Sequence, residues 1–361
     1  MFLAWRDLRV ARGRFALVGV VISLIALLTT LLSGLATGLV DDGISGLRGL
    51  PLTHLALQPG AESSFSRSTL REENLAPFAK AEGVEASPIG MSFFNAKASD
   101  GERLDLALFG VPADSFLLPR PEARRALAGT PGIVLSEGFR TSGLKVGDTL
   151  TISGSDTELP VLGFTYTGSY GHVDIAFTSL ETWQRLQYGD NADGRFSAIA
   201  LRTTGSPDLA ALDRAADTET ETKVAAYQGS PGYAAETATM TLIRGFLLVI
   251  SALVVGAFFT VWTVQRTHQI GLMKALGAST GYVVRDALGQ LFVILTTATA
   301  VGVAVALALG SLVGDGVPFS LQAGPVAGSA IVLVVLGMAG SLVALRRITR
   351  VDPIVALGAE S

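Results

Sequence analysis

The chain has 361 residues, of which 49% are hydrophobic and only 16% are charged, and its mean hydropathy is +0.48. These values are too apolar for an ordinary soluble protein and too polar for a chain embedded wholly in lipid, so a part-membrane protein is expected. The net charge of −4 argues against nucleic-acid binding. The absence of cysteine excludes disulfides, thiol catalysis and thiolate-held metal sites.

Four long apolar stretches predict four transmembrane helices. Each is long enough, at about 1.5 Å per residue, to cross a hydrocarbon core of about 30 Å. The expected spans are residues 15–40, 241–265, 287–313 and 326–345. The first span lacks the usual small-residue cleavage site, so we expect it to be retained rather than removed as a signal peptide.

Basic residues gather at one end of these spans. They are Arg6, Arg9, Arg12, Arg14, Arg266, Lys274, Arg285, Arg346, Arg347 and Arg350. The opposite ends carry Asp41, Asp42 and Asp315. The positive-inside rule therefore predicts a multi-pass protein of the cell membrane with both termini in the cytoplasm and residues 41–240 outside.

The long segment between the first two spans is expected to form an extracellular α+β domain. Runs typical of β-strands alternate there with turn signals, at residues 53–58, 103–111, 132–139, 148–153, 159–168, 173–178 and 196–204. Amphipathic helices are expected at 179–187 and 208–221. The fold class is thus four transmembrane α-helices plus a large extracytoplasmic α+β domain between helices 1 and 2.

The remaining segments complete the expected organisation. It comprises a cytoplasmic amphipathic helix at 1–14, the outer domain at 41–240, a cytoplasmic coupling loop or helix at 266–286, a short outer hairpin at 314–325 and a cytoplasmic tail at 346–361. Gly34 and Gly38, and Gly310 and Gly314, have the spacing that permits close helix approach. That spacing fits packing within the chain as well as a dimer interface.

The segment between the second and third spans combines an apolar face with positive charge. Ile270, Leu272 and Leu276 lie beside Arg266 and Lys274 in the run "VQRTHQIGLMKALGASTGYVVRDALGQ". A short helix of this kind can insert its apolar face into a partner's groove. The alternative is an interfacial helix that lies on lipid.

This segment resembles the coupling region of MacB/FtsX-type ABC transporter permeases, as do the terminal runs "AWRDLRVARGRFAL" and "RITRVDPIVALG". The resemblance assigns ATPase coupling to Arg266, His268, Gln269, Ile270, Gly271, Lys274, Leu276 and Gly277. Gln269 and Gln290 stand where that family often has glutamate, so any ionic contact made by those acids is lost. The implied partners are two copies of a separate ABC ATPase subunit and a second copy of this chain. Membrane lipid surrounds them.

The chain has no phosphate-binding loop of the Gly-x-x-x-x-Gly-Lys-Ser/Thr type. ATP must therefore be bound by the partner subunit, and no intrinsic cofactor is expected. No nucleophile elbow, His-Glu-x-x-His run or metal-ligand cluster is present either, so we expect no catalytic residue in this chain.

Within that family, the chain most resembles the HrtB-type haem exporters of Gram-positive bacteria, through its length and the run "FTYTGSYGHVDIAFTS". Haem as cargo would favour His, Met or Tyr near the iron and Arg near the propionates. The candidates are Tyr233, Glu236, Met240 and Arg244, spaced to share one helix face. Met240 or Tyr233 could ligate the iron. The plainer alternatives are an interfacial tyrosine, ordinary packing and a snorkelling arginine.

A second candidate set lies in a glycine-rich stretch of the outer domain and consists of Tyr166, Tyr170 and His172. A lone histidine there is also compatible with a solvated, hydrogen-bonding role. The sequence thus predicts the permease subunit of an ATP-driven efflux pump that expels haem or a similar amphipathic molecule by squeezing. The alternatives are force transmission to a protein partner on the outer face, or export of peptides, lipoproteins or drugs.

Overall fold

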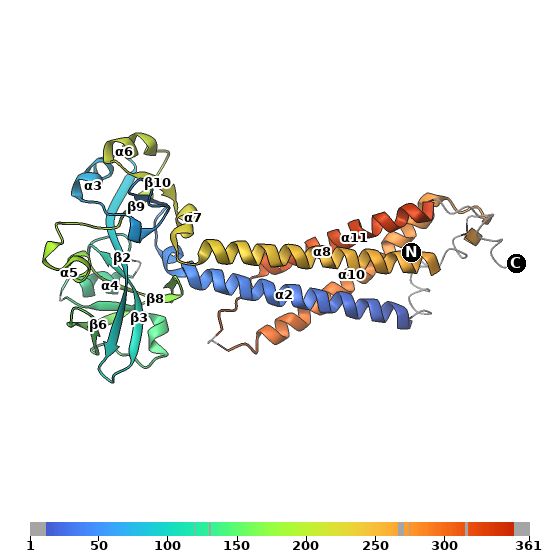
Figure 1. Ribbon diagram of the computed structural model, residues 1–361, viewed down its shortest axis with the longest axis horizontal. Helices are drawn as coiled ribbons and strands as arrows, with labels where there is room; N and C mark the ends of the chain where they lie inside the picture. Colours follow the sequence, from blue (N-terminus) through green and yellow to red (C-terminus); the bar gives the residue numbers. More distant parts are fainter. Residues whose placement is uncertain are drawn as a thin grey trace. The chain divides into compact units, whose positions relative to one another are not determined.

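The computed structural model describes residues 12–349 except 119, 130, 266–270, 274, 315 and 316. Its contacts divide the chain into two compact units (Figure 1). One is Val40–Glu236, and the other combines the segments on either side, which end at Leu39 and resume at Thr237. Two helices run through these divisions, α2 (Arg12–Gly49) and α8 (Tyr233–Gln265).

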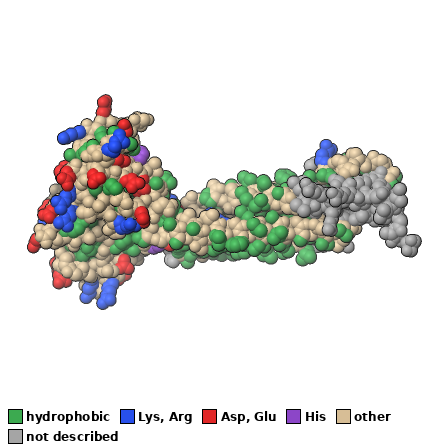
Figure 2. All heavy atoms as spheres, turned by 45° about the horizontal axis from the view of Figure 1, so that its top comes forward, with side chains coloured by type: hydrophobic (Ala, Val, Ile, Leu, Met, Phe, Trp, Pro, Cys, Tyr) green, Lys and Arg blue, Asp and Glu red, His purple; other side chains and the backbone are tan. Residues whose placement is uncertain are grey.

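The unit made of the two flanking segments is helical. Besides most of α2 and α8 it contains α10 (Thr280–Gly310) and α11 (Ala323–Thr349). Each of the four helices holds a stretch long and apolar enough to cross a membrane, namely Ala16–Gly49, Tyr233–Val261, Thr280–Gly310 and Ala323–Ser341. Figure 2 shows hydrophobic side chains along much of the visible surface of this helical unit. The four apolar helices that the sequence predicts are therefore present, and the chain is a membrane protein.

Glycines let the segments of the helical unit approach closely. A Cβ atom on Gly302 of α10 would lie 2.3 Å from the carbonyl oxygen of Ser23 on α2. A Cβ on Gly38 would lie 2.3 Å from the carbonyl oxygen of Pro318, and one on Gly34 would lie 2.7 Å from the Phe319 ring. The glycine pair of α2 thus accommodates the segment between α10 and α11 of the same chain.

The other unit, Val40–Glu236, is an α+β domain built on a ten-stranded sheet. Its strands are β1 (His54–Leu57), β2 (Val84–Ala98), β3 (Arg103–Val111), β4 (Ile133–Ser136), β5 (Thr149–Ile152), β6 (Thr157–Thr165), β7 (Ser169–Tyr170), β8 (Val173–Ser179), β9 (Ala198–Thr203) and β10 (Glu219–Thr222). The strand order is β10-β1-β9-β2-β3-β8-β4-β6-β5, and β7 pairs with β8. Strand β5 also pairs with β2, so the six neighbouring strands β2-β3-β8-β4-β6-β5 form a closed ring.

Short helices lie between these strands and after the last of them. They are η1 (Phe65–Arg67), α3 (Glu72–Ala79), α4 (Pro121–Leu127), η2 (Glu137–Arg140), α5 (Leu180–Tyr188), η3 (Gly189–Asn191), α6 (Leu209–Ala216), α7 (Lys223–Ala226) and η4 (Tyr227–Gly229). The helix expected at 208–221 is wrong in its second half. Asp208 caps α6 through its side chain, but Asp217 adopts a left-handed conformation and ends the helix. Strand β10 follows instead and pairs with β1.

The longest strand, β2, was missing from the sequence prediction. It contains Pro88 and Gly90, which normally signal turns. The structure gives Gly90 a packing role, because a Cβ there would lie 2.2 Å from the Trp183 ring. Gly110 on the paired strand β3 leaves room for the same tryptophan.

Alternate residues of the strands point to two hydrophobic clusters. Phe109 belongs to one cluster, together with Tyr170 and Phe177. Leu108 belongs to the other cluster, together with Trp183. Two packed faces explain why several strands read as continuous apolar runs rather than as a strict alternation.

Candidate functional site

A tight turn places His172 at one edge of the α+β domain. Strands β7 and β8 pair as a hairpin whose two connecting residues, Gly171 and His172, have φ of +58° and +64°. Positive φ at both positions is typical of a two-residue hairpin of type I′. The Gly171 N–H donates to the carbonyl oxygen of Gly43 at 2.9 Å and to Ser230 Oγ at 3.2 Å. The turn is thereby held against α2 and against the segment that precedes α8.

His172 connects two carboxylates from opposite ends of the domain's sequence. Its Nδ1 lies 2.9 Å from Asp42 Oδ2 on α2, and its Nε2 lies 2.9 Å from Glu236 Oε1 on α8. A neutral imidazole can donate from only one nitrogen, so two carboxylate partners favour the imidazolium form. Burial by itself lowers the pKa of His172, but the hydrogen bonds and negative charges of both carboxylates raise it above its ordinary value.

The carboxylates have further contacts that fix the cluster. Asp42 Oδ1 accepts a hydrogen bond from Ser169 Oγ at 3.0 Å. Glu236 Oε2 is buried and has no hydrogen-bond partner among the described residues. Within the part of the chain that the structure describes, no three His, Asp or Glu side chains are grouped as a metal ion requires. Through its two contacts of 2.9 Å, the His172 ring bridges Asp42 near the end of α2 and Glu236 at the start of α8.

The two tyrosines of the second candidate set lie inside the domain. Tyr166 Oη donates to the carbonyl oxygen of Gly46 at 2.7 Å, and its ring fills the space beside Gly49. Burial raises its pKa. Tyr170 is 1% exposed and packs against the rings of Phe65 and Phe109. Of this set, Tyr170 is buried, Tyr166 is partly exposed and His172 is exposed.

The four residues of the first candidate set lie on α8. The Tyr233 ring packs 6.2 Å from that of Tyr227, Glu236 bonds to His172, and Met240 is half-buried. Arg244 donates from a terminal guanidinium nitrogen to the carbonyl oxygen and Oγ of Ser33, at 3.0 and 3.3 Å. Its Nε is buried and has no hydrogen-bond partner within the described chain.

The structure therefore joins the two candidate sets at one contact, between His172 and Glu236. Sequence reasoning missed the roles of Asp42 and Ser33 in these contacts. The sequence marks Asp42 only as a charge at the end of a transmembrane span, because a bond across 130 residues has no local signal. Ser33 carries no signal at all in an apolar helix.

The predicted coupling segment is described in part. Arg266, His268, Gln269, Ile270 and Lys274 lie outside the described residues. Leu276 is 80% exposed, and Gly277 has φ of +97°. The Ala278 N–H donates to the carbonyl oxygen of Met273 at 2.9 Å, which is the closing bond of a glycine-ended helix. The described part thus presents an exposed leucine beside a helix end.

The chain is similar to known membrane proteins along its whole length. The family described as FtsX-like permease C-terminal matches residues 241–353. A putative hemin transport system permease protein HrtB from Staphylococcus haemolyticus is 27% identical over 360 residues, covering 99% of each chain. The Staphylococcus epidermidis protein of the same name is 23% identical over 361 residues, again covering 99% of each chain.

The chain is an ABC transporter permease whose residues 241–353 match the FtsX-like C-terminal domain. An uncharacterised ABC transporter permease from Mycobacterium bovis is 25% identical to this permease over 367 residues, with 99% of each chain covered. Among solved structures, the periplasmic region of MacB from Actinobacillus actinomycetemcomitans is 13% identical, with a TM-score of 0.36 over 49% of this chain and 92% of that one.

Proposed function

We propose that this permease is the membrane subunit of an ABC exporter for haem or a similar amphipathic molecule. The observation that carries the proposal is the 27% identity over 99% of both chains with a putative hemin transport permease. In this arrangement two copies of a separate ATPase subunit bind and hydrolyse ATP, and two copies of the permease face each other. The chain itself supplies the path and the moving parts.

The charge pattern supports an orientation for this exporter. Basic residues flank the apolar helices at the ends that carry the coupling segment, and acidic residues such as Asp41 and Asp42 flank the other ends. The positive-inside rule then puts the coupling segment and both termini in the cytoplasm. The α+β domain would lie outside the cell.

One face of α8 offers groups suited to haem. The residues Tyr233, Glu236, Met240 and Arg244 follow at intervals of three and four on one continuous helix. The Met240 thioether or the Tyr233 phenol could approach the iron. The Arg244 Nε–H, which has no partner among the described residues, could donate to a propionate oxygen. Haem is cargo in this scheme and no resident cofactor is required.

ATP-driven closure of the ATPase pair would press on the coupling segment and tilt α2 and α8. Because these two helices continue without a break into the α+β domain, their tilt would reach Asp42 and Glu236 at the His172 bridge. Closing the space between two permease copies would then squeeze the cargo outward.

The test combines cells and the reconstituted complex. Cells that lack the permease should become more sensitive to haem, and haem should stimulate the ATPase of the complex in proteoliposomes. Arg244→Gln should reduce that stimulation about tenfold through loss of one charge-assisted hydrogen bond. Val249→Ala, which trims an exposed α8 side chain, is the matched control. If haem affects neither the cells nor the ATPase, haem export is refuted and force transmission to an outer partner becomes the better explanation.

A further inference from the structure

The long strand β2 has a gap in its pairing along one edge. Strand β3 pairs with residues 90–97 of β2. On the other edge, β9 pairs with residues 84–89 and β5 pairs with residues 96–98. Residues 90–95 of β2 thus have a strand neighbour on one edge only within the described chain.

Hydrogen bonds at the two ends of this gap show that β9 and β5 share the edge. The carbonyl oxygen of Ile89 accepts from the Ser197 N–H at 3.0 Å, and that of Asn95 accepts from the Ser153 N–H at 2.8 Å. Alternate residues of a strand direct their backbone groups to the same edge, so Phe93 directs its N–H and C=O into the gap. Met91 also faces it, and its N–H donates to the Ser197 side chain.

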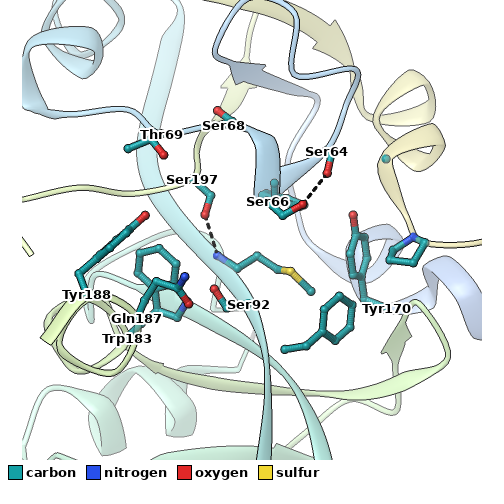
Figure 3. Close-up of a pocket in the computed structure, with 15 residues that line it drawn as sticks. Ser64, Ser66, Ser68, Thr69, Ser92, Tyr170, Trp183, Gln187, Tyr188 and Ser197 are labelled. Carbon is teal, nitrogen blue, oxygen red and sulfur yellow. Dashed lines mark hydrogen bonds between the residues drawn. The ribbon is translucent and has the colours of Figure 1, made fainter. Parts of the chain in front are cut away.

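A cavity of about 320 Å³ opens beside this gap. Figure 3 shows that its walls lie on both sides of β2, with Trp183, Gln187 and Tyr188 on one side and Tyr170 on the other. The Phe93 ring stacks on Tyr170 and is 45% exposed. An added strand would therefore send alternate side chains toward two different aromatic walls.

Two buried groups in the walls have no hydrogen-bond partner in the part of the chain that the structure describes. Tyr170 Oη and Trp183 Nε1 belong to side chains that are each 1% exposed, and neither has a hydrogen-bond partner among the described residues. Buried donors are nearly always satisfied in native proteins, and an unsatisfied one calls for a ligand or an ordered water. Both are donors, and the carbonyl oxygens of a peptide are acceptors.

The lining also defines the charge of the occupant. It consists of hydroxyl, amide, thioether and aromatic side chains together with Gly229 and Pro231, and no Lys, Arg, His, Asp or Glu is among the residues that line it. A charged group would be desolvated there without a counter-charge, which is costly. The cavity thus suits an uncharged stretch of chain.

We propose that the open edge of β2 at Phe93, between Met91 and Asn95, binds an extended, uncharged peptide segment of a partner protein by strand addition. The partner's backbone pairs with Phe93, and one of its side chains lies against Phe93 and Tyr170 while the next faces Trp183. This function is independent of haem export, since the gap and the cavity belong entirely to the α+β domain.

In the experiment, peptides of about ten residues are selected from a random displayed library for binding to the full-length permease in nanodiscs. Peptides that also bind the Phe93→Pro variant are removed by counter-selection. Proline removes the N–H that faces the gap and spares the pairing with β3, so the strand should tolerate it. Phe93→Ala is the matched variant, because it removes the ring and keeps the N–H. Thermal unfolding of all three proteins checks the fold.

We expect selected peptides with an uncharged, alternating centre whose affinity falls about tenfold in Phe93→Pro and about threefold in Phe93→Ala. Methylating the peptide nitrogens that face β2 should also weaken binding about tenfold, because strand addition uses main-chain hydrogen bonds. Amide hydrogen exchange at residues 91–95 should slow when peptide binds.

Three results would each overturn the proposal. The first is recovery of no peptide whose binding depends on the Phe93 N–H. The second is full affinity after N-methylation of the peptide. The third is slowed exchange at residues 91–95 with N-acetylglucosamine and not with the selected peptide, which would make the cavity a sugar site.

Discussion

The imidazole Nε2 of His172 lies 2.9 Å from the Glu236 carboxylate, although 64 residues separate them in the sequence. The same ring bonds Asp42 at its other nitrogen. A single side chain in a hairpin turn thus links the helix that enters the α+β domain to the helix that leaves it. The strength of that link depends on protonation.

We expect the stability of the permease to depend on pH through His172. The two carboxylates raise its folded-state pKa above the ordinary histidine value of about 6.5. Its stabilising contribution is therefore fully present below about pH 6.5 and is lost as pH rises through the folded pKa. The effect is at most about 1 kcal/mol, because the cluster is partly exposed to water.

The measurement is the melting temperature of the full-length protein between about pH 5.5 and 8.5. His172→Asn should remove the decline with rising pH, and asparagine tolerates the positive φ at this position. His54→Asn is the control, since the His54 ring bonds Thr53 rather than a carboxylate. An unchanged pH profile in His172→Asn would contradict the assignment.

Two tyrosines form a matched pair for testing buried hydroxyls. Tyr166→Phe removes the hydrogen bond to Gly46 and leaves the Gly46 carbonyl oxygen without this donor. The free energy of unfolding should therefore fall by about 1 kcal/mol. Tyr170→Phe removes a buried hydroxyl that has no partner among the described residues, so stability should be unchanged or higher. Denaturant unfolding of both variants checks the order, and equal losses would show that Tyr170 is satisfied by water.

The Lys223 side chain caps the C-terminal end of α2, which lies in the α+β domain. Its Nζ donates to the carbonyl oxygens of Arg48 and Leu50, at 2.6 and 2.5 Å, and burial lowers its pKa. Lys223→Met should cost about 1–3 kcal/mol, since it leaves these carbonyls without their charged donor. Lys80→Met, at an exposed position, is the control and should change thermal stability little.

Glycine packing predicts opposite effects at two positions of α2. Gly38→Ala should destabilise the permease by about 2 kcal/mol, because the new methyl group would meet the Pro318 carbonyl 2.3 Å away. Gly19→Ala meets no atom within 4 Å, and alanine favours helix, so stability should stay the same or rise. Thermal unfolding in detergent distinguishes the two. If Gly38→Ala leaves the stability unchanged, the segment near Pro318 can move to accommodate the added methyl group.

Strong periodic signals in the sequence predict most of this fold. Length and hydropathy suffice for the four helices, and each expected β run contains or overlaps a strand. Strand β2 could not be predicted, because Pro88 and Gly90 read as turn signals until Trp183 is seen to need the space beside Gly90. The end of α6 at Asp217 likewise depends on the pairing of β10 with β1.

The candidate site could be predicted only as two separate groups. Helical spacing placed Tyr233, Glu236, Met240 and Arg244 together, while composition alone singled out His172 with its neighbouring tyrosines. Nothing local indicates that His172 reaches both Asp42 and Glu236, because those contacts arise from the closure of the whole domain. Which residues of the two groups touch cargo stays a prediction.

The pairing of β1 with β9 and β10 determines when β1 can join the sheet during synthesis. Strand β1 finds its partners in β9 and β10, so His54 pairs with Leu201 and Thr222. These contacts join residues more than a hundred positions apart, which makes the domain slow to form. The first strand of the nascent chain stays unpaired until nearly the whole domain has emerged. Its exposed edge in that interval is where a chaperone would be needed most.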